Sequence, residues 1–544
     1  MKAHCLPFEQ IPDSSRLFLD FLQYSPNVRP FYPHSPNFSE WVKAEASALQ
    51  YDAPRRERVS EILARQNASW NASPQALANI DRLRKGAAAV VTGQQVGLFG
   101  GPMFAFYKAL TAVKLAEQAT AAGVDAVPVF WLATYDHDLA EVNHVSLPGS
   151  EGALQTLTTA SHGVAGAPVS EIRLGEEILP VVEEAASLLG DSEPIQFLRE
   201  AYRPGESLGT AFARFFARLF ASWGVILLDA SDAELHRVAA PVYRAAIERA
   251  GDLDSGLLAR GEALEKAGYH QQVKVTGSSV LLFTLRDGAR TTIHRRMNES
   301  SGEAEFFIGA DTGAEKLSKA QLLEQIAARP ENFSPNVLLR PVVQDYLLPT
   351  LAYAGGPAEI AYFAQAGAVY ETLAERVTPV VPRFSATLVE AKTQRWLQHY
   401  GVSIADVFQG VENVRRRLAA SALPEGLQSA FDEAQRVLEA SLAGLQKALE
   451  DLDPTLVGAS QTAGSKMNYQ LDRLRQAATA AELRKSEVLG RHAEALTRKL
   501  YPNGELQERG IAGIYFVARH GMELLREIYD AILPDCHDHQ ILEL

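Results

Sequence analysis

The feature that most constrains this fold is a glycine-rich stretch between an apolar run and a long helical segment. Residues 92–102 have the sequence TGQQVGLFGGP, follow the apolar run 87–91 and precede the segment 103–122, which contains no helix breaker. Short apolar runs form buried strands, and proline suits the first turn of a helix. The pattern predicts a strand, a glycine turn and a helix. Glycine lets the backbone approach a ligand closely, and the N–H groups of a helix start attract anions.

A second apolar run, residues 127–133, ends in another cluster of polar side chains. Strand, helix and strand form a βαβ unit with parallel strands and a right-handed crossover. Ligands of such sheets bind beyond the carboxyl ends of the strands, so both clusters are expected to face one crevice. A plain strand–turn–helix connection and a structural histidine are the alternatives. The candidate site residues are Gly93, Gln94, Gln95, Gly97, Gly101 and Lys108 from the first cluster, and Asp136, His137, Asp138 and Asn143 from the second.

Residues 353–363 repeat this arrangement, because an apolar run again leads into two glycines and a proline. Gly355 and Gly356 would form the turn, and Glu359 lies in the first turn of the expected helix. A carboxylate at that position either caps the helix or contacts a ligand. Two such helix starts in one core predict a pocket with two anion-binding walls.

Further apolar patterns place the other elements of the fold. The amino-terminal 85 residues have helical patterns, the run 225–229 predicts a third buried strand, and residues 337–345 return the chain to the core. A further sheet and a final helix are also expected, with short strands at 273–275, 279–285 and 291–294, a hairpin turn at Asp287–Gly288 and the helix at 511–528.

The carboxyl-terminal part of the chain differs in kind. Apolar residues, most of them leucine, recur at mostly three- and four-residue steps between residues 427 and 452, and the pattern resumes after Pro454 with charged residues between the apolar ones. This is typical of a coiled coil and predicts a helical hairpin with Pro454 near its tip. The hairpin is either a packed arm of one chain or a dimerisation element. A second copy of the chain would cover the apolar seam, so we expect a homodimer through this arm.

At 544 residues the chain is too long for one hydrophobic core. We therefore predict an α/β protein with a Rossmann-like parallel-sheet core, two inserted modules and a long C-terminal α-helical coiled-coil arm. The expected boundaries are 1–150 for the first part of the core with its N-terminal helices, 151–205 for the first insertion, 206–255 for the second part of the core, 256–330 for the second insertion, 331–385 for the third part of the core, 386–500 for the arm and 501–544 for a C-terminal segment that packs back on the core.

Charge and composition exclude several partners. The net charge of −14 argues against nucleic acid and anionic membrane surfaces. A hydrophobic content of 47% is ordinary for a globular protein, and no apolar run is long enough to span a bilayer. The amino terminus lacks the apolar core of a signal peptide. We expect a cytoplasmic protein with small-molecule substrates and with no nucleic-acid or membrane partner.

The two cysteines, Cys5 and Cys536, lie near opposite ends of the chain. That usage is typical of reduced thiols in the cytoplasm rather than of a disulfide scaffold. Cys536 opens the run Cys-His-Asp-His, but four consecutive side chains cannot all face one ion. The run is therefore interpreted as a mobile polar tail, and no permanently bound metal is expected.

Three long blocks of the sequence resemble the bacillithiol-biosynthesis family BshC. They are TGQQVGLFGGPMFAFYKALTAVKLA from residue 92, PVFWLATYDHDLAEVNHV from residue 128 and LRPVVQDYLLPTLAYAGGPAEIAYFAQ from residue 339, and the tail adds Gln507-Glu508-Arg509 and a closing HQILEL. One departure is Tyr135, where an acidic residue is expected in many members, so no catalytic carboxylate is assumed there. The resemblance adds Gln344, Asp345, Tyr362 and Arg509 to the candidate ligand-binding residues.

The resemblance implies a ligase that joins the carboxyl group of cysteine to the amine of glucosaminyl malate, in the last step of bacillithiol synthesis. Amide formation needs an activated acyl group, so ATP or ADP is a candidate ligand for the glycine turn and Lys108. Asp136, His137 and Asp138 would bind the cysteine ammonium or act as the base. A metal held by Asp136, Asp138 and His144 fits no standard zinc spacing.

Two other functions fit the same sequence patterns. One is a nucleotidyltransferase-like enzyme that activates another carboxylic acid, and the other is a non-catalytic nucleotide-binding scaffold. Fold and anion sites alone do not distinguish them, because one fold supports many functions.

Overall fold

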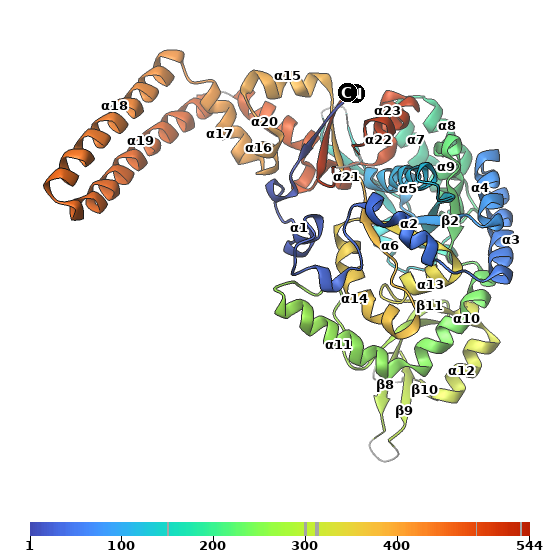
Figure 1. Ribbon diagram of the computed structural model, residues 1–544. Helices are drawn as coiled ribbons and strands as arrows, with labels where there is room; N and C mark the ends of the chain where they lie inside the picture. Colours follow the sequence, from blue (N-terminus) through green and yellow to red (C-terminus); the bar gives the residue numbers. More distant parts are fainter. Residues whose placement is uncertain (150–151, 161, 299–301, 310–314, 486, 534–535) are drawn as a thin grey trace. The chain divides into compact units, whose positions relative to one another are not determined.

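The computed structural model describes residues 1–149, 152–160, 162–298, 302–309, 315–485, 487–533 and 536–544 (Figure 1). The chain divides into two compact units. The first comprises residues 1–9, 13–387 and 508–542, and the second comprises residues 10–12, 388–507 and 543–544. Within the described ranges, no helix is both long and apolar enough to cross a membrane.

A five-stranded parallel sheet forms the centre of the first unit. Its strand order is β13-β12-β2-β3-β6, and every neighbouring pair is parallel. The strands expected at 87–91, 127–133 and 225–229 are confirmed, and so is the α/β class with a Rossmann-like sheet. The strand bounds are β2 Ala88–Gln94, β3 Ala126–Leu132, β6 Ile226–Asp229, β12 Thr350–Gly355 and β13 Val380–Pro382.

The glycine turn joins β2 to α5 (Met103–Ala121), the helix that follows it in sequence as expected. Side chains of α5 and α2 (Phe38–Ala48) pack with alternate residues of β2, and with residues of β12, in one hydrophobic cluster. Alternation is required because successive strand residues point to opposite faces of a sheet. The long helix α14 (Pro357–Leu373) follows β12 in the same way that α5 follows β2.

The amino-terminal region is helical, as the sequence predicts, apart from a short first strand that was not predicted. Its elements are β1 Lys2–Leu6, α1 Arg16–Leu22, α2, α3 Ala53–Ser69 and α4 Pro74–Lys85. Between β3 and β6 the chain forms a short antiparallel hairpin and several helices. These elements are α6 Leu139–Val142, β4 His144–Pro148, β5 Leu154–Thr158, α7 Ile178–Leu189, α8 Glu193–Ala201 and α9 Leu208–Leu219.

A second sheet follows helices α10 (Ala233–Glu248) and α11 (Ala250–Lys266) and is antiparallel throughout. Its order is β10-β9-β8-β7-β11, and the predicted turn at Asp287 and Gly288 joins its two longest strands. The bounds are β7 Ser279–Arg286, β8 Ala289–Met297, β9 Ala304–Ile308, β10 Glu315–Ser318 and β11 Phe333–Pro335, with α12 Lys319–Ala328 between the last two.

The strand predicted at residues 273–275 is wrong. The segment has no strand partner, because the side chain of Gln365 on α14 takes both hydrogen-bonding groups of Val273. The amide Nε2 donates to the Val273 carbonyl and Oε1 accepts from the Val273 N–H, each at 2.8 Å. The side-chain amide of Gln365 therefore makes the hydrogen bonds that the backbone of a neighbouring strand would otherwise make.

The final helix expected over 511–528 is also wrong, because the chain breaks it at Gly521. Gly521 has a φ of 86°, which ends α22 (Gly513–His520), and α23 (Glu523–Ala531) starts anew. The run 536–539, expected to be a mobile tail, leads into strand β15 (His539–Glu543). Strands β1, β15 and β14 (Ala386–Val389) form a three-stranded sheet in that order. His539 is fully buried there, with Ser385 Oγ at 2.8 Å and Thr387 Oγ1 at 2.9 Å.

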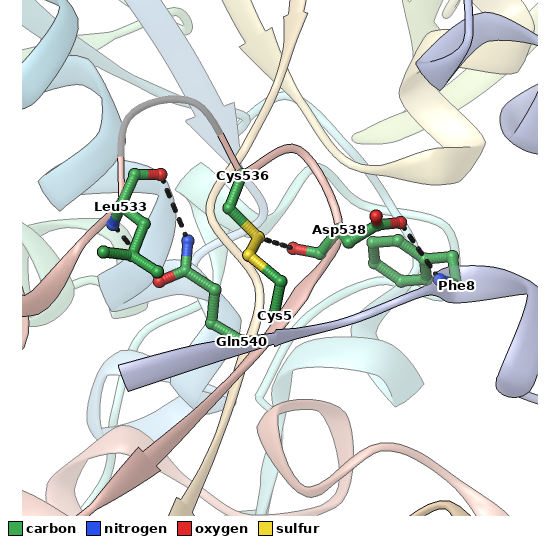
Figure 2. The surroundings of a disulfide bond; sticks show 6 residues. All are labelled: Cys5, Phe8, Leu533, Cys536, Asp538 and Gln540. Atoms are coloured by element: carbon green, nitrogen blue, oxygen red, sulfur yellow. Dashed lines mark hydrogen bonds between the residues drawn. A yellow bond between two sulfur atoms is a disulfide. The ribbon is translucent and has the colours of Figure 1, made fainter. Parts of the chain in front are cut away.

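The two cysteines form a disulfide, which corrects the expectation of reduced thiols. Cys5 and Cys536 are 531 residues apart in sequence, and their Cα atoms are 6.3 Å apart. Figure 2 shows the bond beside β1 and the carboxyl-terminal segment, where the Asp538 carboxylate accepts a hydrogen bond from the N–H of Phe8 at 3.0 Å. Two cysteines so far apart could not be paired from spacing, because only the tertiary fold brings the chain ends together.

The second unit is helical and contains the predicted hairpin. Figure 1 shows α18 (Glu425–Leu452) and α19 (Val457–Lys485) as two long antiparallel helices, and Pro454 lies in the connection between them. This confirms the C-terminal coiled-coil arm. The other helices of this region are α15 Ala391–Tyr400, α16 Ile404–Phe408, α17 Val411–Ser421 and α20 Glu487–Leu500, and the short α21 Gln507–Gly510 follows them.

Candidate active site

A pocket of about 610 Å³ lies at the carboxyl edge of the parallel sheet. Its walls come from the segments that leave β2, β3, β12 and β13, together with residues of β7, β8 and the start of α13 (Arg340–Leu347). This is where ligands of open parallel sheets bind, and the volume is typical of small-molecule sites. Of the predicted site residues, the pocket is lined by Gly93, Gln94, Gln95, Lys108, Asp136, His137, Gly356, Glu359, Tyr362 and Arg509.

The glycine turn contributes its first residues to the pocket but not its last ones. Gly93 lies against Trp131 of the neighbouring strand, and a Cβ on Gly93 would be 3.0 Å from the Trp131 Cβ. Gly97 and Gly101 do not line the pocket. They pack on each other, since a Cβ on Gly97 would be 3.0 Å from the Gly101 Cα, and Gly101 has a φ of 72°. These two glycines shape the turn rather than a ligand surface.

Each of the two helix starts has one N–H group that is already bound by a protein acceptor. At the start of α5, the N–H of Met103 donates to the Ile511 carbonyl at 3.0 Å. At the start of α14, the N–H of Gly356 donates to the Glu359 carboxylate at 2.8 Å. Protein acceptors thus satisfy these donors, and the acceptor at α5 comes from a segment about four hundred residues later in the chain, which no local pattern reveals.

Glu359 and Lys108 connect the two glycine–proline helix starts by an ion pair. The Lys108 ammonium lies 2.5 Å from the Glu359 carboxylate, and it also donates to the Gly93 carbonyl at 2.7 Å and to Gln94 Oε1 at 2.9 Å. Burial lowers the pKa of Lys108 to about 8, and the neighbouring Glu359 opposes that shift. Burial raises the pKa of Glu359, but the Lys108 charge and the Gly356 N–H outweigh it, so the net shift is downward. Both groups are ionised at neutral pH.

Asp136 and His137 form the second polar part of the pocket with a residue from the antiparallel sheet, Arg290 of β8. The Arg290 guanidinium donates to Asp136 Oδ1 at 3.2 Å and lies 3.3 Å from His137 Nδ1. Gln95 Nε2 donates to Asp136 Oδ2 at 2.9 Å. Arginine can only donate, so a hydrogen bond from Arg290 requires His137 Nδ1 to accept, and the tautomer that accepts there carries its ring proton on Nε2. The site therefore presents an oriented carboxylate and an N–H donor side by side.

The other predicted residues do not line the pocket. Asp138 precedes α6 and Asn143 follows it. Gly355 ends β12, where a Cβ would be 3.1 Å from the Glu359 Cβ. Asp345 is half-buried and accepts hydrogen bonds from the hydroxyls of Tyr370 and Thr378, and desolvation of its carboxylate raises its pKa. Gln344 is fully buried and holds the guanidinium of Arg340 at 3.0 Å.

Several pocket residues were missed by sequence reasoning. Arg290, Arg340 and Arg383 all line the pocket, and each is buried along most of its side chain. Arg383 follows β13 and pairs with Glu508 at 2.6 Å. Arg383 could have been predicted, because it directly follows a strand of the parallel sheet. Arg290 could not, because it comes from an inserted module whose position relative to the sheet the sequence does not give. Tyr135, the departure noted above, is also buried in the pocket wall.

No metal ligands gather in this pocket. Among the residues that the structure describes, no group of three or more histidine, cysteine or acidic side chains is placed to hold a metal ion. His144, the third member of the weak metal hypothesis, lies exposed on β4.

Comparison with known proteins gives a consistent result over the whole chain. The family model for the N-terminal Rossmann-like domain of bacillithiol biosynthesis BshC matches residues 1–384, and the model for its C-terminal coiled-coil domain matches residues 386–544. Proteins named "Putative cysteine ligase BshC" are similar along their full lengths. The one from Koribacter versatilis is 46% identical over all of both chains, and that from Solibacter usitatus is 36% identical over all of both chains. The one from Salinibacter ruber is 33% identical over 99% of this chain and 98% of its own.

Proposed function

Because this chain belongs to the bacillithiol-biosynthesis family BshC, we propose that its pocket joins the carboxyl group of cysteine to the amine of glucosaminyl malate. The observation that carries the proposal is the charge of the pocket. In a chain of net charge −14, arginines and a lysine line this one cavity beside the Asp136 carboxylate. Cysteine brings an ammonium and a carboxylate, and the malate part brings further carboxylates, so such mixed charge suits both substrates.

The two polar groups of the pocket suggest separate roles in this reaction. Gln95 and Arg290 orient the Asp136 carboxylate, which suits it to bind the cysteine ammonium. The Nε2–H of His137 suits the carbonyl oxygen of the activated cysteine, on which negative charge develops when the sugar amine attacks. The amine nitrogen forms the new bond to the acyl carbon, the activating group leaves with the bonding electrons, and the amine loses a proton.

We propose ATP as the source of the activated acyl group, since an amide does not form from a free carboxylate in water. A catalytic metal is no part of the proposal. If an acyl-adenylate forms, labelled pyrophosphate will enter ATP in the presence of cysteine alone. Product without such exchange would favour an acyl-phosphate.

The test of the function itself is direct product analysis. The purified chain is incubated with cysteine, glucosaminyl malate and ATP, singly and together, and the amide is identified by mass spectrometry. Product that requires all three supports the ligase. Turnover of ATP with another acid but not cysteine would favour the nucleotidyltransferase-like alternative, and ATP binding without turnover of any acid would favour a scaffold.

A homodimer through the coiled-coil arm belongs to the same proposal. The hairpin of α18 and α19 leaves large apolar side chains exposed by 38% to 76%, and a second copy could cover them. These side chains are Leu427, Val437, Leu445, Leu452, Met467, Tyr469 and Leu474.

We also propose a cytoplasmic location. Cysteine and ATP are metabolites of that compartment, and the reaction needs both. Fractionation of cells with an antibody against the chain tests this placement, and recovery outside the cytoplasm would contradict it.

A further inference from the structure

The cations of the pocket differ in how their charge is balanced. Lys108 pairs with Glu359, Arg290 pairs with Asp136 at 3.2 Å, and Arg383 pairs with Glu508 at 2.6 Å. Arg509 is exposed to solvent, which screens its charge. The remaining cation of the lining is Arg340. Its relative exposure is 7%, and it forms no ion pair with any carboxylate in the described part of the chain.

The neighbours of Arg340 orient it but do not neutralise it. Its guanidinium donates to Gln344 Oε1 at 3.0 Å and to the Tyr362 hydroxyl at 2.7 Å, and it lies 5.0 Å from the centroid of the Tyr353 ring. These contacts use two of the five N–H donors that a guanidinium has. Glu359 is nearby but is bound to Lys108. A buried charge without a counter-ion is costly, so a protein keeps one where a ligand supplies the opposite charge.

We propose that Arg340 binds a carboxylate of the malate group of the substrate. This inference rests on the proposed function and assigns a substrate group to one wall of its pocket. A guanidinium matches two carboxylate oxygens with a pair of parallel N–H donors, and Gln344 and Tyr362 hold it in position for that contact.

The chemistry of the reaction selects between the available anions. The cysteine carboxyl group loses its charge on activation, so a residue that fixes it as a carboxylate would oppose the reaction. The malate carboxylates are unchanged from substrate to product. The phosphates of ATP share the same recognition chemistry, and the experiment separates them.

The experiment measures affinities by calorimetry for the wild type, Arg340→Gln and Arg340→Lys. The probes are glucosaminyl malate, the methyl glycoside of glucosamine, cysteine and ATP. Removing one partner of a buried, hydrogen-bonded charge pair is expected to weaken glucosaminyl malate binding about 100-fold in Arg340→Gln. Arg340→Lys keeps the charge but loses the paired donors, so a loss of about tenfold is expected. Affinity for the methyl glycoside, cysteine and ATP should not change.

Arg376→Gln is the matched control. Arg376 is also largely buried and pairs with Glu45 at 2.7 Å, but it does not line the pocket. This substitution should lower the thermal midpoint without changing any affinity.

The proposal would be overturned if Arg340→Gln weakened the binding of glucosaminyl malate and of the methyl glycoside of glucosamine equally. Loss of cysteine or ATP binding instead of glucosaminyl malate binding would also overturn it. If the wild type forms product and Arg340→Gln keeps its KM for glucosaminyl malate, this inference fails while the proposed function stands.

Discussion

At the scale of single residues, the buried pair of Lys108 and Glu359 links the stability of the core to alkaline pH. Burial lowers the pKa of Lys108 from 10.5 to about 8, so the folded state releases this proton at a lower pH than the unfolded state. The contribution of Lys108 to the free energy of unfolding therefore rises between about pH 8 and pH 10.5. The whole shift corresponds to about 3 kcal/mol. Denaturant unfolding of wild type and Lys108→Met should show the wild type gaining stability over the variant in that window.

A parallel pH dependence of the two proteins would contradict this, because it would mean that Lys108 keeps its ordinary pKa. Lys114 provides the control. It lies on the same helix, and its ammonium donates to the Tyr529 carbonyl at 3.2 Å rather than to a carboxylate. Lys114→Met leaves the pair of Lys108 and Glu359 intact, so it should keep the alkaline gain of the wild type.

His137 provides the second residue-scale prediction. His137→Ala should lower kcat by about 100-fold, the usual cost of losing one hydrogen-bond donor to a developing oxyanion. Its side chain is 40% exposed, so the thermal midpoint should stay nearly constant. His137→Gln retains an N–H donor and should recover part of the rate. The measurement is steady-state kinetics with cysteine and glucosaminyl malate at saturation.

His144→Ala, which changes an exposed histidine outside the pocket, is the control and should be silent. If His137 acted as a general base instead, its substitution would remove the acidic limb of the pH–rate profile, and glutamine would not restore activity. Full activity of His137→Ala would assign the residue to a structural role.

The sequence located part of this site because the rule for parallel sheets is local. Gln95, Asp136 and Glu359 each follow a strand within a few residues, and the sheet brings them to one edge. Arg290 and Arg340 could not be found in this way. Arg290 reaches the pocket from an antiparallel sheet. Arg340 becomes a candidate for ligand binding only when the structure shows that no carboxylate pairs with it in the described part of the chain. Asp345 was predicted to bind a ligand but does not line the pocket, and its carboxylate is instead hydrogen-bonded to the hydroxyls of Tyr370 and Thr378.

At the scale of elements, the hairpin of α18 and α19 is the predicted dimer contact. Removing the residues between Leu423 and Glu487 and inserting a short flexible loop should give a monomer. The base of the hairpin can tolerate the cut, because α17 and α20 contact each other through Arg415 and Glu494 at 2.7 Å. Light scattering of the shortened chain measures the outcome.

A second variant separates loss of the seam from a general effect of the deletion. Leu445→Glu with Leu474→Glu places charges on exposed apolar positions of the hairpin and should also give a monomer. A dimer that survives both changes would place the interface elsewhere.

A helix or strand could be predicted where a local sequence pattern determines it. It could not be predicted where a side chain that is distant in sequence determines the local backbone structure. The hairpin follows from its leucine spacing and Pro454, and β7 and β8 follow from the Asp287–Gly288 turn. A strand was expected at residues 273–275, but the side chain of Gln365 on α14 binds both backbone groups of Val273. Gly521 is a weak breaker in sequence, and its positive φ shows why the last helix is divided.

At the scale of the whole molecule, the disulfide between Cys5 and Cys536 constrains nearly the entire chain. A crosslink that closes so long a loop restricts the unfolded state, and disulfides typically add about 2–4 kcal/mol to the free energy of unfolding. Cys5 is exposed and Cys536 is half-buried, so a reductant can reach the bond. Reduction should therefore lower the thermal midpoint of the wild type, measured by calorimetry with and without dithiothreitol.

Cys5→Ser tests whether that effect belongs to this bond. The variant should have the lower midpoint from the start and should not respond to dithiothreitol. We also expect reduction to affect the pocket, because Cys536 precedes β15, whose His539 contacts Ser385, and Ser385 shares Glu508 with the pocket residue Arg383. The KM for glucosaminyl malate should then rise in Cys5→Ser and in the reduced wild type alike. Two titratable thiols in the untreated, denatured wild type would contradict the disulfide. If the thermal midpoints of the wild type and of Cys5→Ser responded equally to dithiothreitol, the shift would come from another group.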